Sequence, residues 1–161
     1  MKLKLKTVNQ MISALGGMSG RNRIIEADGK VTGQAFEPYA FPAQTRVNIV
    51  RNLNVLRPLA EVYTDARKEL IKTLSPDGTP KAVDDNPVLA AKFTKENDDL
   101  LNSKVDAKGL AAISYADLET AKVDPQTITL LGVLVRGTPE VKAEDLLPDS
   151  LGESEEQKAS S

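Results

Sequence analysis

The chain has 161 residues, of which 40% are hydrophobic and 4% aromatic, a length and composition that suit one domain of ordinary size. It contains no Cys and no His. This excludes disulfides, thiol catalysis and cysteine-based zinc sites, and it removes the commonest general base and metal ligand. The net charge of −2 differs from the strongly basic signature of nucleic-acid-binding domains. Because no apolar run approaches the roughly 20 residues that span a bilayer, we expect an intracellular protein.

The N-terminal residues predict a short strand followed by a helix. Residues 2–6 alternate Lys with Leu, a period of two that is typical of a half-buried strand and not of a signal peptide. Thr7 begins a capping box, which places the start of the helix at Val8. The double glycine at 16–17 predicts its end.

A β-hairpin is predicted next. Apolar residues on both sides of Asp28-Gly29 indicate two strands, and this pair supplies the positive φ angles of a tight turn. Phe36, Tyr39 and Phe41 hold three of the six aromatic side chains, and we expect them to pack the segment onto the helices. We interpret residues 21–41 as a hairpin-like insertion into the domain.

A long helix over residues 43–74 is the strongest signal in the chain. Apolar residues recur there at spacings of three and four, which is one face of a helix. Because Pro58 removes a backbone donor and clashes with the preceding turn, we expect a kink or a short break at residues 54–57. The face consists of Val50, Leu53, Leu56, Ala60, Tyr63, Arg67, Leu70 and Leu74.

A second helix is predicted after a loop that extends to residue 85. Asn86 caps it, and Pro87 occupies its first position, where the missing N–H has no cost. We expect it to run to about residue 103. Its inward side chains would be Leu89, Phe93, Leu100 and Leu101.

Three short segments complete the predicted domain. Residues 110–113 indicate a short strand, and Ser114 with Asp117 predicts the cap of a single helical turn. The apolar run that starts at Asp124-Pro125 is interpreted as a buried helix ending at Gly137.

From residue 138 the composition becomes acidic. Residues 138–161 include seven acidic and two basic side chains, and they have too few large apolar residues to offset the entropy of ordering. We therefore predict a disordered acidic tail after a single globular domain over residues 1–137. The predicted fold class is α+β and helix-dominated: the kinked long helix packs on the second helix and a C-terminal helix. The N-terminal strand, the hairpin and the strand near residue 110 form one small sheet.

The sequence contains no motif for catalysis, for a cofactor or for a metal. The glycine-rich residues 16–21 lack the Lys-Ser or Lys-Thr ending of a phosphate-binding loop. The acidic pairs 84–85 and 98–99 lack the ligand spacing of a calcium loop. We therefore expect that the protein is not an enzyme.

Arginines of the long helix and leucines of the tail are the candidate interaction surface. The arginines could form a phosphate-binding stripe or an ordinary solvated face, and we expect Arg46 and Arg57 to lie too far apart in helical phase to form one patch. The leucines would be the contacts if the tail folds on a partner. The candidate residues are Arg46, Arg51, Arg57, Arg67, Leu146, Leu147 and Leu151.

The order of these segments resembles a family of small bacteriophage proteins of unknown function, often encoded among structural and morphogenesis genes. The resemblance spans residues 2–135, with LRPLAEVYTDARKELI at 56–71 and ISYADL at 113–118, and residues 20–39 look like an insertion. It implies a phage protein that contacts virion or host proteins. It carries over no site residues.

The leading hypothesis is a non-enzymatic bacteriophage accessory protein that acts by protein–protein contacts in virion structure or assembly. Its expected location is the cytoplasm of the bacterial host or the virion. One alternative is a phage-encoded inhibitor of a host defence protein. The other is a weak nucleic-acid-binding regulator, which the modest charge disfavours. Homo-oligomerisation stays open, and we expect no cofactor and no membrane association.

Overall fold

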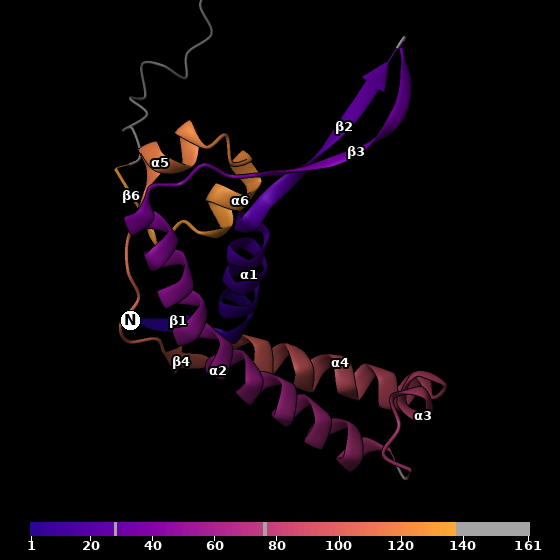
Figure 1. Cartoon of the computed structure of the whole chain (residues 1–161). Coiled ribbons are helices and arrows are strands. Elements are labelled where there is room, and N and C mark those ends of the chain that lie inside the picture. The colour runs from indigo at the N-terminus through magenta and orange to yellow at the C-terminus, as the bar shows by residue number, and fades with distance from the viewer. Residues whose placement is uncertain (28, 76, 138–161) are drawn as a thin grey trace, which may run out of the picture.

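The computed structural model describes residues 1–27, 29–75 and 77–137, and this part of the chain has the predicted α+β, helix-dominated fold (Figure 1). The elements in chain order are β1 (Lys2–Lys4), α1 (Leu5–Gly16), the 3-10 turn η1 (Gly17–Ser19), β2 (Gly20–Ala27), β3 (Lys30–Pro38), α2 (Ala43–Leu74), α3 (Pro80–Asp84), α4 (Pro87–Asn102), β4 (Lys104–Asp106), β5 (Ile113–Ser114), α5 (Tyr115–Thr120), α6 (Pro125–Leu130) and β6 (Val135–Arg136).

The main core forms where α1 packs against α2 and α6 (Figure 1). Val8, Met11 and Leu15 recur on one face of α1 and are at most 2% exposed. They share one cluster with Leu56 of α2 and Leu118 of α5. Full burial of one such side chain contributes roughly 1.5–3 kcal/mol, so this cluster holds the body of the protein together.

The described strands form three separate two-stranded sheets, and the predicted single sheet is wrong. β1 pairs antiparallel with β4, so that Leu3 lies opposite Val105. β2 and β3 form the predicted hairpin. β5 and β6 pair in parallel, with Ile113 opposite Val135. Two of the pairs, β1–β4 and β5–β6, join strands that are distant in the chain, whereas β2 and β3 follow one another.

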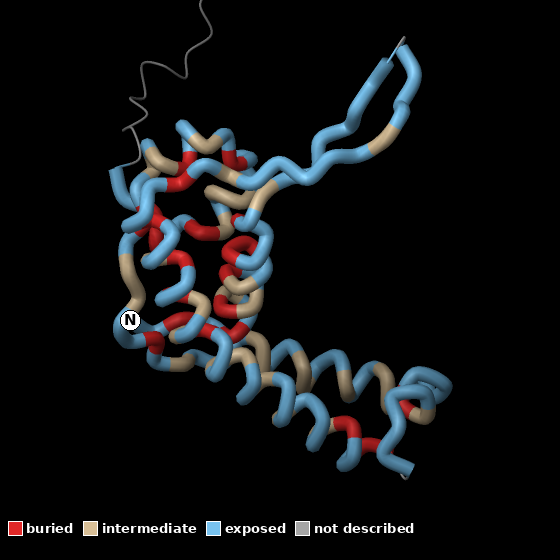
Figure 2. The backbone as a smooth tube through the Cα atoms, viewed as in Figure 1, coloured by how far each residue is buried: buried red, intermediate tan, exposed pale blue. Residues whose placement is uncertain are grey.

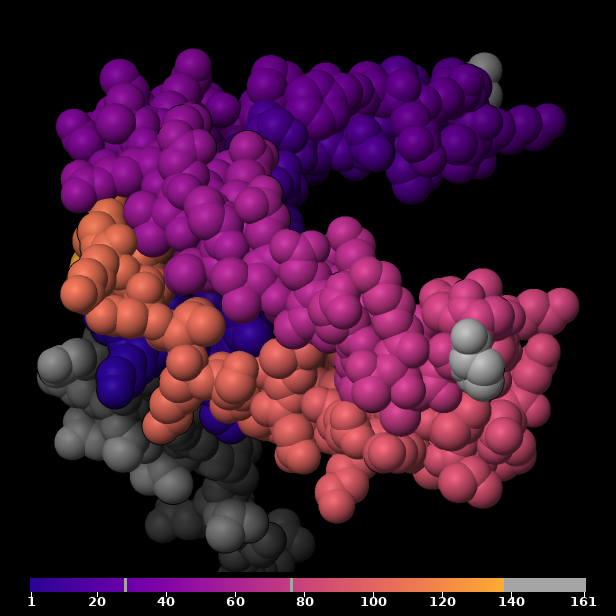
Figure 3. All heavy atoms as spheres, turned by 90° about the horizontal axis from the view of Figure 1, so that it is seen from below, coloured from indigo at the N-terminus to yellow at the C-terminus, as the bar shows by residue number. Residues whose placement is uncertain are grey.

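Two arms leave the body toward the same side, with open space between them (Figures 1 and 3). The hairpin arm consists of β2 and β3. The helical arm consists of residues 59–75 and 77–102, which contain the C-terminal half of α2, α3 and α4. A small second cluster, centred on Ile71, Leu74 and Val83, holds the helical arm together. Most of the tube in both arms has the pale blue of exposed residues (Figure 2).

The long helix has the predicted bounds, 43–74, and is one continuous element. Pro58 is the sixteenth of its 32 residues, and the ribbon changes direction near its middle (Figure 1). The kink agrees with the loss of a backbone donor, whereas the alternative, a break, is wrong. The predicted buried face needs one correction, because Val50 is 56% exposed while Ile49 is buried.

The ends of α1 differ from the prediction. The helix starts at Leu5, whose N–H donates to the carbonyl of Ser103 at 3.0 Å, and no side chain caps it. A long-range contact therefore sets the start instead of the capping box at Thr7. Gly17 has a right-handed φ of −73° and leads into η1, so it is not the left-handed glycine cap that was expected.

The C-terminal half also departs from the prediction at several points. Asn86 caps α4 as predicted, with its side chain accepting from two backbone N–H groups, but the inward residues of α4 are only half-buried. The loop before it contains α3, which the Thr79 side chain caps. The predicted strand at 110–113 is confirmed only at Ile113, and β4 was missed. The apolar run from Pro125 is helical only to Leu130 and ends in β6.

Candidate interaction surface

The hairpin arm is built on a regular antiparallel register. Arg21 lies opposite Glu37, Asn22 opposite Phe36 and Ile25 opposite Gly33, with one bulge between Ile25 and Glu26. Gly29, in the turn, has a φ of +71°, a conformation that glycine adopts without strain. The predicted hairpin is therefore confirmed, with strands longer than the short flanks that suggested it.

Apolar side chains project from the hairpin arm into solvent. Ile24 is 56% exposed, Ile25 46%, Val31 65% and Phe36 59%. Every described residue of the two strands except Gly20 and Gly33 is exposed (Figure 2). Phe36 therefore does not pack the segment onto the helices, contrary to expectation. A two-stranded hairpin pointing away from the body offers its side chains no apolar neighbours beyond its own strands.

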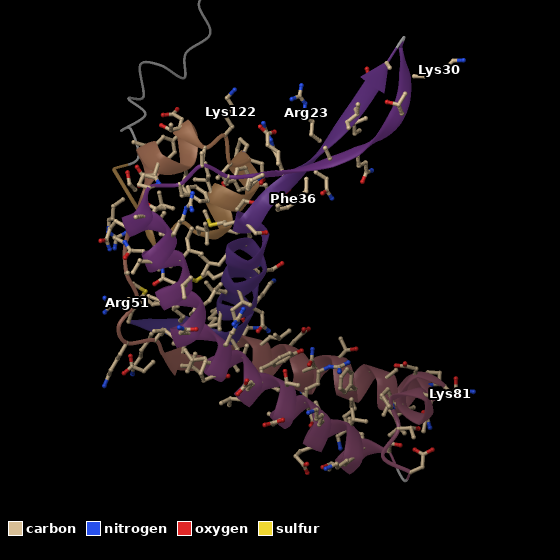
Figure 4. The ribbon with its side chains drawn as sticks, viewed as in Figure 1. Arg23, Lys30, Phe36, Arg51, Lys81 and Lys122 are labelled. Carbon is tan, nitrogen blue, oxygen red and sulfur yellow. The ribbon has the colours of Figure 1, made fainter. Side chains whose placement is uncertain are left out.

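Apolar residues lie on both faces of the hairpin arm. Ile24 and Ile25 are consecutive in one strand, so their side chains point to opposite faces. Figure 4 shows Arg23 and Phe36 on opposite sides of the ribbon as well. Two adjacent isoleucines in a two-stranded hairpin cannot both be buried by one neighbouring surface, so the sequence itself contains a signal that part of this apolar surface is exposed.

The base of the hairpin arm is held closely against the body. Phe41 and Tyr39 pack this segment onto the helices as predicted: Phe41 is buried, Tyr39 packs against the core, and 5.6 Å separates their ring centroids.

Gly20 leaves no room for a side chain at the start of β2. A Cβ on Gly20 would lie 2.4 Å from the carbonyl oxygen of Glu37 and 2.5 Å from the Phe36 ring. Glycine is therefore needed where the strands leave the body.

An ion pair closes the same base. The Arg21 guanidinium donates to one Glu37 carboxylate oxygen from both Nε, at 3.1 Å, and Nη2, at 2.9 Å. The hydrogen bond and the charge of Arg21 hold the pKa of the Glu37 carboxyl below its ordinary range. Both groups are exposed, so the pair fixes the geometry of the base more than it adds stability.

The four candidate arginines of α2 do not form one surface. Arg51 donates from Nε to the carbonyl of Gly109 at 2.9 Å, and it projects from the body on the side away from the arms (Figure 4). Arg67 lies in the helical arm, 5.3 Å from the centroid of the Phe93 ring, a cation–π contact. These two arginines hold α2 to other elements and lie apart from Arg46 and Arg57.

Polar side chains of α2 bind the irregular segment before β5. Asn52 is fully buried, its Nδ2 donates to the Ala111 carbonyl at 2.9 Å, and its Oδ1 accepts from the Ala111 N–H at 2.7 Å. Asn48 donates to the Ala112 carbonyl at 2.8 Å. The bond from Arg51 to the Gly109 carbonyl extends this row of contacts, so Arg51 also helps to bind residues 109–112 to α2.

Asp117 also has a structural role instead of the predicted one. It accepts a hydrogen bond from the buried Thr45 hydroxyl of α2. Ser114 makes no side-chain cap. The single helical turn begins where it was predicted, but a contact with α2 replaces the capping box.

Arg46 and Arg57 share one pocket, which corrects the expectation from helical phase. They are eleven residues apart, about three turns at 3.6 residues per turn, so they lie on the same face of α2. The pocket, of about 400 Å³, lies at the base of the hairpin arm, between the end of α1, residues 38–41 and α2. Its lining residues are Leu15, Gly16, Met18, Ser19, Pro38, Tyr39, Phe41, Arg46, Ile49, Val50, Leu53 and Arg57.

The pocket has an apolar floor and a basic rim. Leu15, Met18 and Phe41 are buried core residues, whereas both arginines are exposed. Arg46 is fixed in place by a 3.0 Å bond from its Nε to the Phe41 carbonyl. The lining contains no carboxylate, so this pocket offers no paired acid and base. It suits an apolar ligand that carries negative charge.

The structure bears on some of the other sites and segments considered from the sequence. The glycine-rich residues 16–21 form the end of α1, η1 and the start of β2, which is not the strand-to-helix turn of a phosphate-binding loop. Within residues 1–27, 29–75 and 77–137, no three Asp or Glu residues group as metal ligands. Among the described helices, none is both long and apolar enough to cross a membrane. Leu146, Leu147 and Leu151 lie outside the described residues.

Comparisons of the chain with protein-family models, with curated protein sequences and with solved structures gave no match. The resemblance to phage proteins therefore stays a prediction.

Proposed function

We propose that the chain is a non-enzymatic bacteriophage accessory protein that acts by protein–protein contacts in virion structure or assembly. The hairpin arm is the element that makes the contact. The observation that carries this proposal is the exposure of Ile24, Ile25, Val31 and Phe36, between 46% and 65%, on an arm that leaves the body.

Physical chemistry favours a partner for such an arm. A two-stranded hairpin is only marginally stable alone in water. Its two strands also present unpaired backbone groups at both edges, where another chain can add. Because these four apolar side chains lie on both faces of the arm, a partner has to enclose the arm to bury them all. Such burial contributes several kcal/mol at ~25 cal/mol per Å², before the cost of association is subtracted.

The positions of the arginines favour protein contacts over nucleic acid. A phosphate-binding stripe needs its charges along one face. Arg51 and Arg67 instead bond to the Gly109 carbonyl and stack on Phe93, which leaves Arg46 and Arg57 as a pair beside an apolar floor. The phage setting itself rests on the resemblance of residues 2–135.

The proposal is tested with purified particles and assembly intermediates. Mass spectrometry should find the chain in one of these fractions in a fixed ratio to a structural protein. The variant Ile24→Ser with Phe36→Ser should be lost from that fraction. Val88→Ser is the matched control, because Val88 is 75% exposed on the helical arm, and it should stay. Absence of the unaltered chain from particles and intermediates would remove the assembly role, and capture of a host protein instead would favour the inhibitor.

A further inference from the structure

The pocket at the base of the hairpin arm has a specific chemistry. Leu15, Met18, Phe41, Ile49 and Leu53 supply an apolar floor. Arg46 and Arg57 stand on the rim about three helical turns apart, roughly 16 Å along the axis at 1.5 Å per residue. A ligand that fills this pocket therefore needs bulky apolar groups with negative charges on both sides of them, a pattern that an extended peptide of six to eight residues can supply.

One segment of this chain has that pattern. Residues 144–151 read EDLLPDSL, with three leucines, three acidic side chains and no basic one. Its first two residues are acidic, the adjacent leucines follow, and Asp149 comes after them. The alternation of charge and leucine matches a floor flanked by two guanidinium groups.

The segment can reach the pocket. Residues 138–161 follow β6, which pairs with β5, and β5 follows directly on Ala112, which Asn48 of α2 binds. The end of β6 therefore lies beside the same half of α2 that carries the pocket, although on another face of the helix. Leu146 is the ninth residue after Gly137, and nine residue steps of extended chain span up to about 30 Å. This exceeds the 10–12 Å diameter of a helix.

We propose that the pocket at the base of the hairpin arm binds residues 144–151 of the same chain, with the leucines on the apolar floor and the acidic side chains at Arg46 and Arg57. The tail then covers the base of the hairpin arm. A partner that takes up the tail uncovers the pocket, so the tail competes with acidic, leucine-containing peptides of other proteins. This inference does not depend on the phage setting or on the contact made by the arm.

Cysteine pairs in the full-length chain test this binding, since the chain has no Cys of its own. Ser150→Cys places a thiol beside the leucines. Val50→Cys places the second thiol in the pocket lining. Val47→Cys is the matched control: Val47 is 58% exposed against 56% for Val50 and lies one turn away on α2, outside the pocket. Disulfides form only when the two Cα atoms approach within about 7 Å, so the comparison reports docking rather than tether length.

The Val50→Cys pair should oxidise at least about tenfold faster than the Val47→Cys pair, as an intramolecular product. High salt or Arg57→Glu should abolish this excess, because screening and charge reversal remove the attraction. Arg67→Glu, on the helical arm, should leave it unchanged. Equal rates for the two pairs overturn the proposal, and so does an excess that Arg57→Glu does not reduce. Predominantly dimeric products also overturn it, because they assign the pocket to the tail of a second copy.

Discussion

Asn52→Ala should be among the most destabilising single changes in the protein, although it removes only a small polar side chain. Asn52 is fully buried on α2, and its amide makes two hydrogen bonds to the N–H and carbonyl of Ala111. Its removal leaves both backbone groups without a partner. Each unsatisfied group costs roughly 1–3 kcal/mol, so we expect a total loss of about 3 kcal/mol. Since 1 kcal/mol shifts the melting temperature of a protein of this size by about 2–4 °C, Tm should fall by roughly 9 °C.

Urea and thermal unfolding followed by circular dichroism at the helix band measures both quantities. Asn48→Ala is the control, because Asn48 lies on the same helix and makes one, more exposed bond to Ala112. It should cost only about 0.5–1 kcal/mol. If Asn52→Ala costs no more than Asn48→Ala, the bonds to Ala111 do not hold the segment before β5 on α2, and the structural role assigned to this face of the helix is wrong.

Three further predictions concern the hairpin arm. Gly20→Ala should displace the base of the arm, because the new Cβ meets backbone atoms at 2.4 and 2.8 Å, whereas Gly33→Ala on the same hairpin has open space; amide chemical shifts of the two variants report the difference. The pKa of the Glu37 carboxyl should lie below its ordinary range. The contribution of its ion pair to the stability of the arm is therefore present above the unfolded-state pKa and is lost as pH falls through the lowered folded-state pKa. A carboxyl-carbon NMR titration measures this pKa, and Glu37→Gln should remove this pH dependence of stability. Phe36→Ser should change the free energy of unfolding by less than about 1 kcal/mol, because the ring is 59% exposed. Leu56→Ala, at a fully buried position, should instead lower it by about 2–5 kcal/mol. Equal losses of stability in denaturant unfolding would contradict the exposed position of the Phe36 ring.

Local patterns predicted the elements that local chemistry determines. The bounds of α2 follow from an apolar repeat over 32 residues, and the start of α4 follows from Asn86-Pro87. The hairpin turn follows from a glycine that tolerates positive φ. In each case the physical cause lies within a few residues of its effect, so a single sequence contains it.

The predictions that were wrong have a common physical cause: contacts between residues that are distant in the sequence determine these elements. The N–H of Leu5 bonds to Ser103, which starts α1 earlier than the capping box indicates. Asp117 bonds to Thr45 instead of capping its own helix. β4 is only three residues long, and it exists because β1 pairs with it. None of these partners is visible from the local sequence.

The candidate surface was predictable only in part. Arg46 and Arg57 could have been placed together from their spacing of eleven residues, but the apolar floor between them comes from α1 and residues 38–41 as well. The exposure of the hairpin arm was not predicted, because the aromatic residues were expected to pack the segment onto the helices. The adjacent Ile24 and Ile25, which point to opposite faces, indicate only that one neighbouring surface cannot bury both. The direction of the arm away from the body required the structure.

Hydrogen exchange of the hairpin amides tests the central claim most directly. The exchange rates of the chain free in solution are compared with those of the chain in the particle or intermediate that contains it. If the hairpin arm is the contact element, amides of β2 and β3 that exchange rapidly in the free protein should slow by at least about tenfold in the assembly, while α1 in the core changes little. Unchanged exchange in both strands, with new protection on another element, would show that the protein makes its contacts elsewhere.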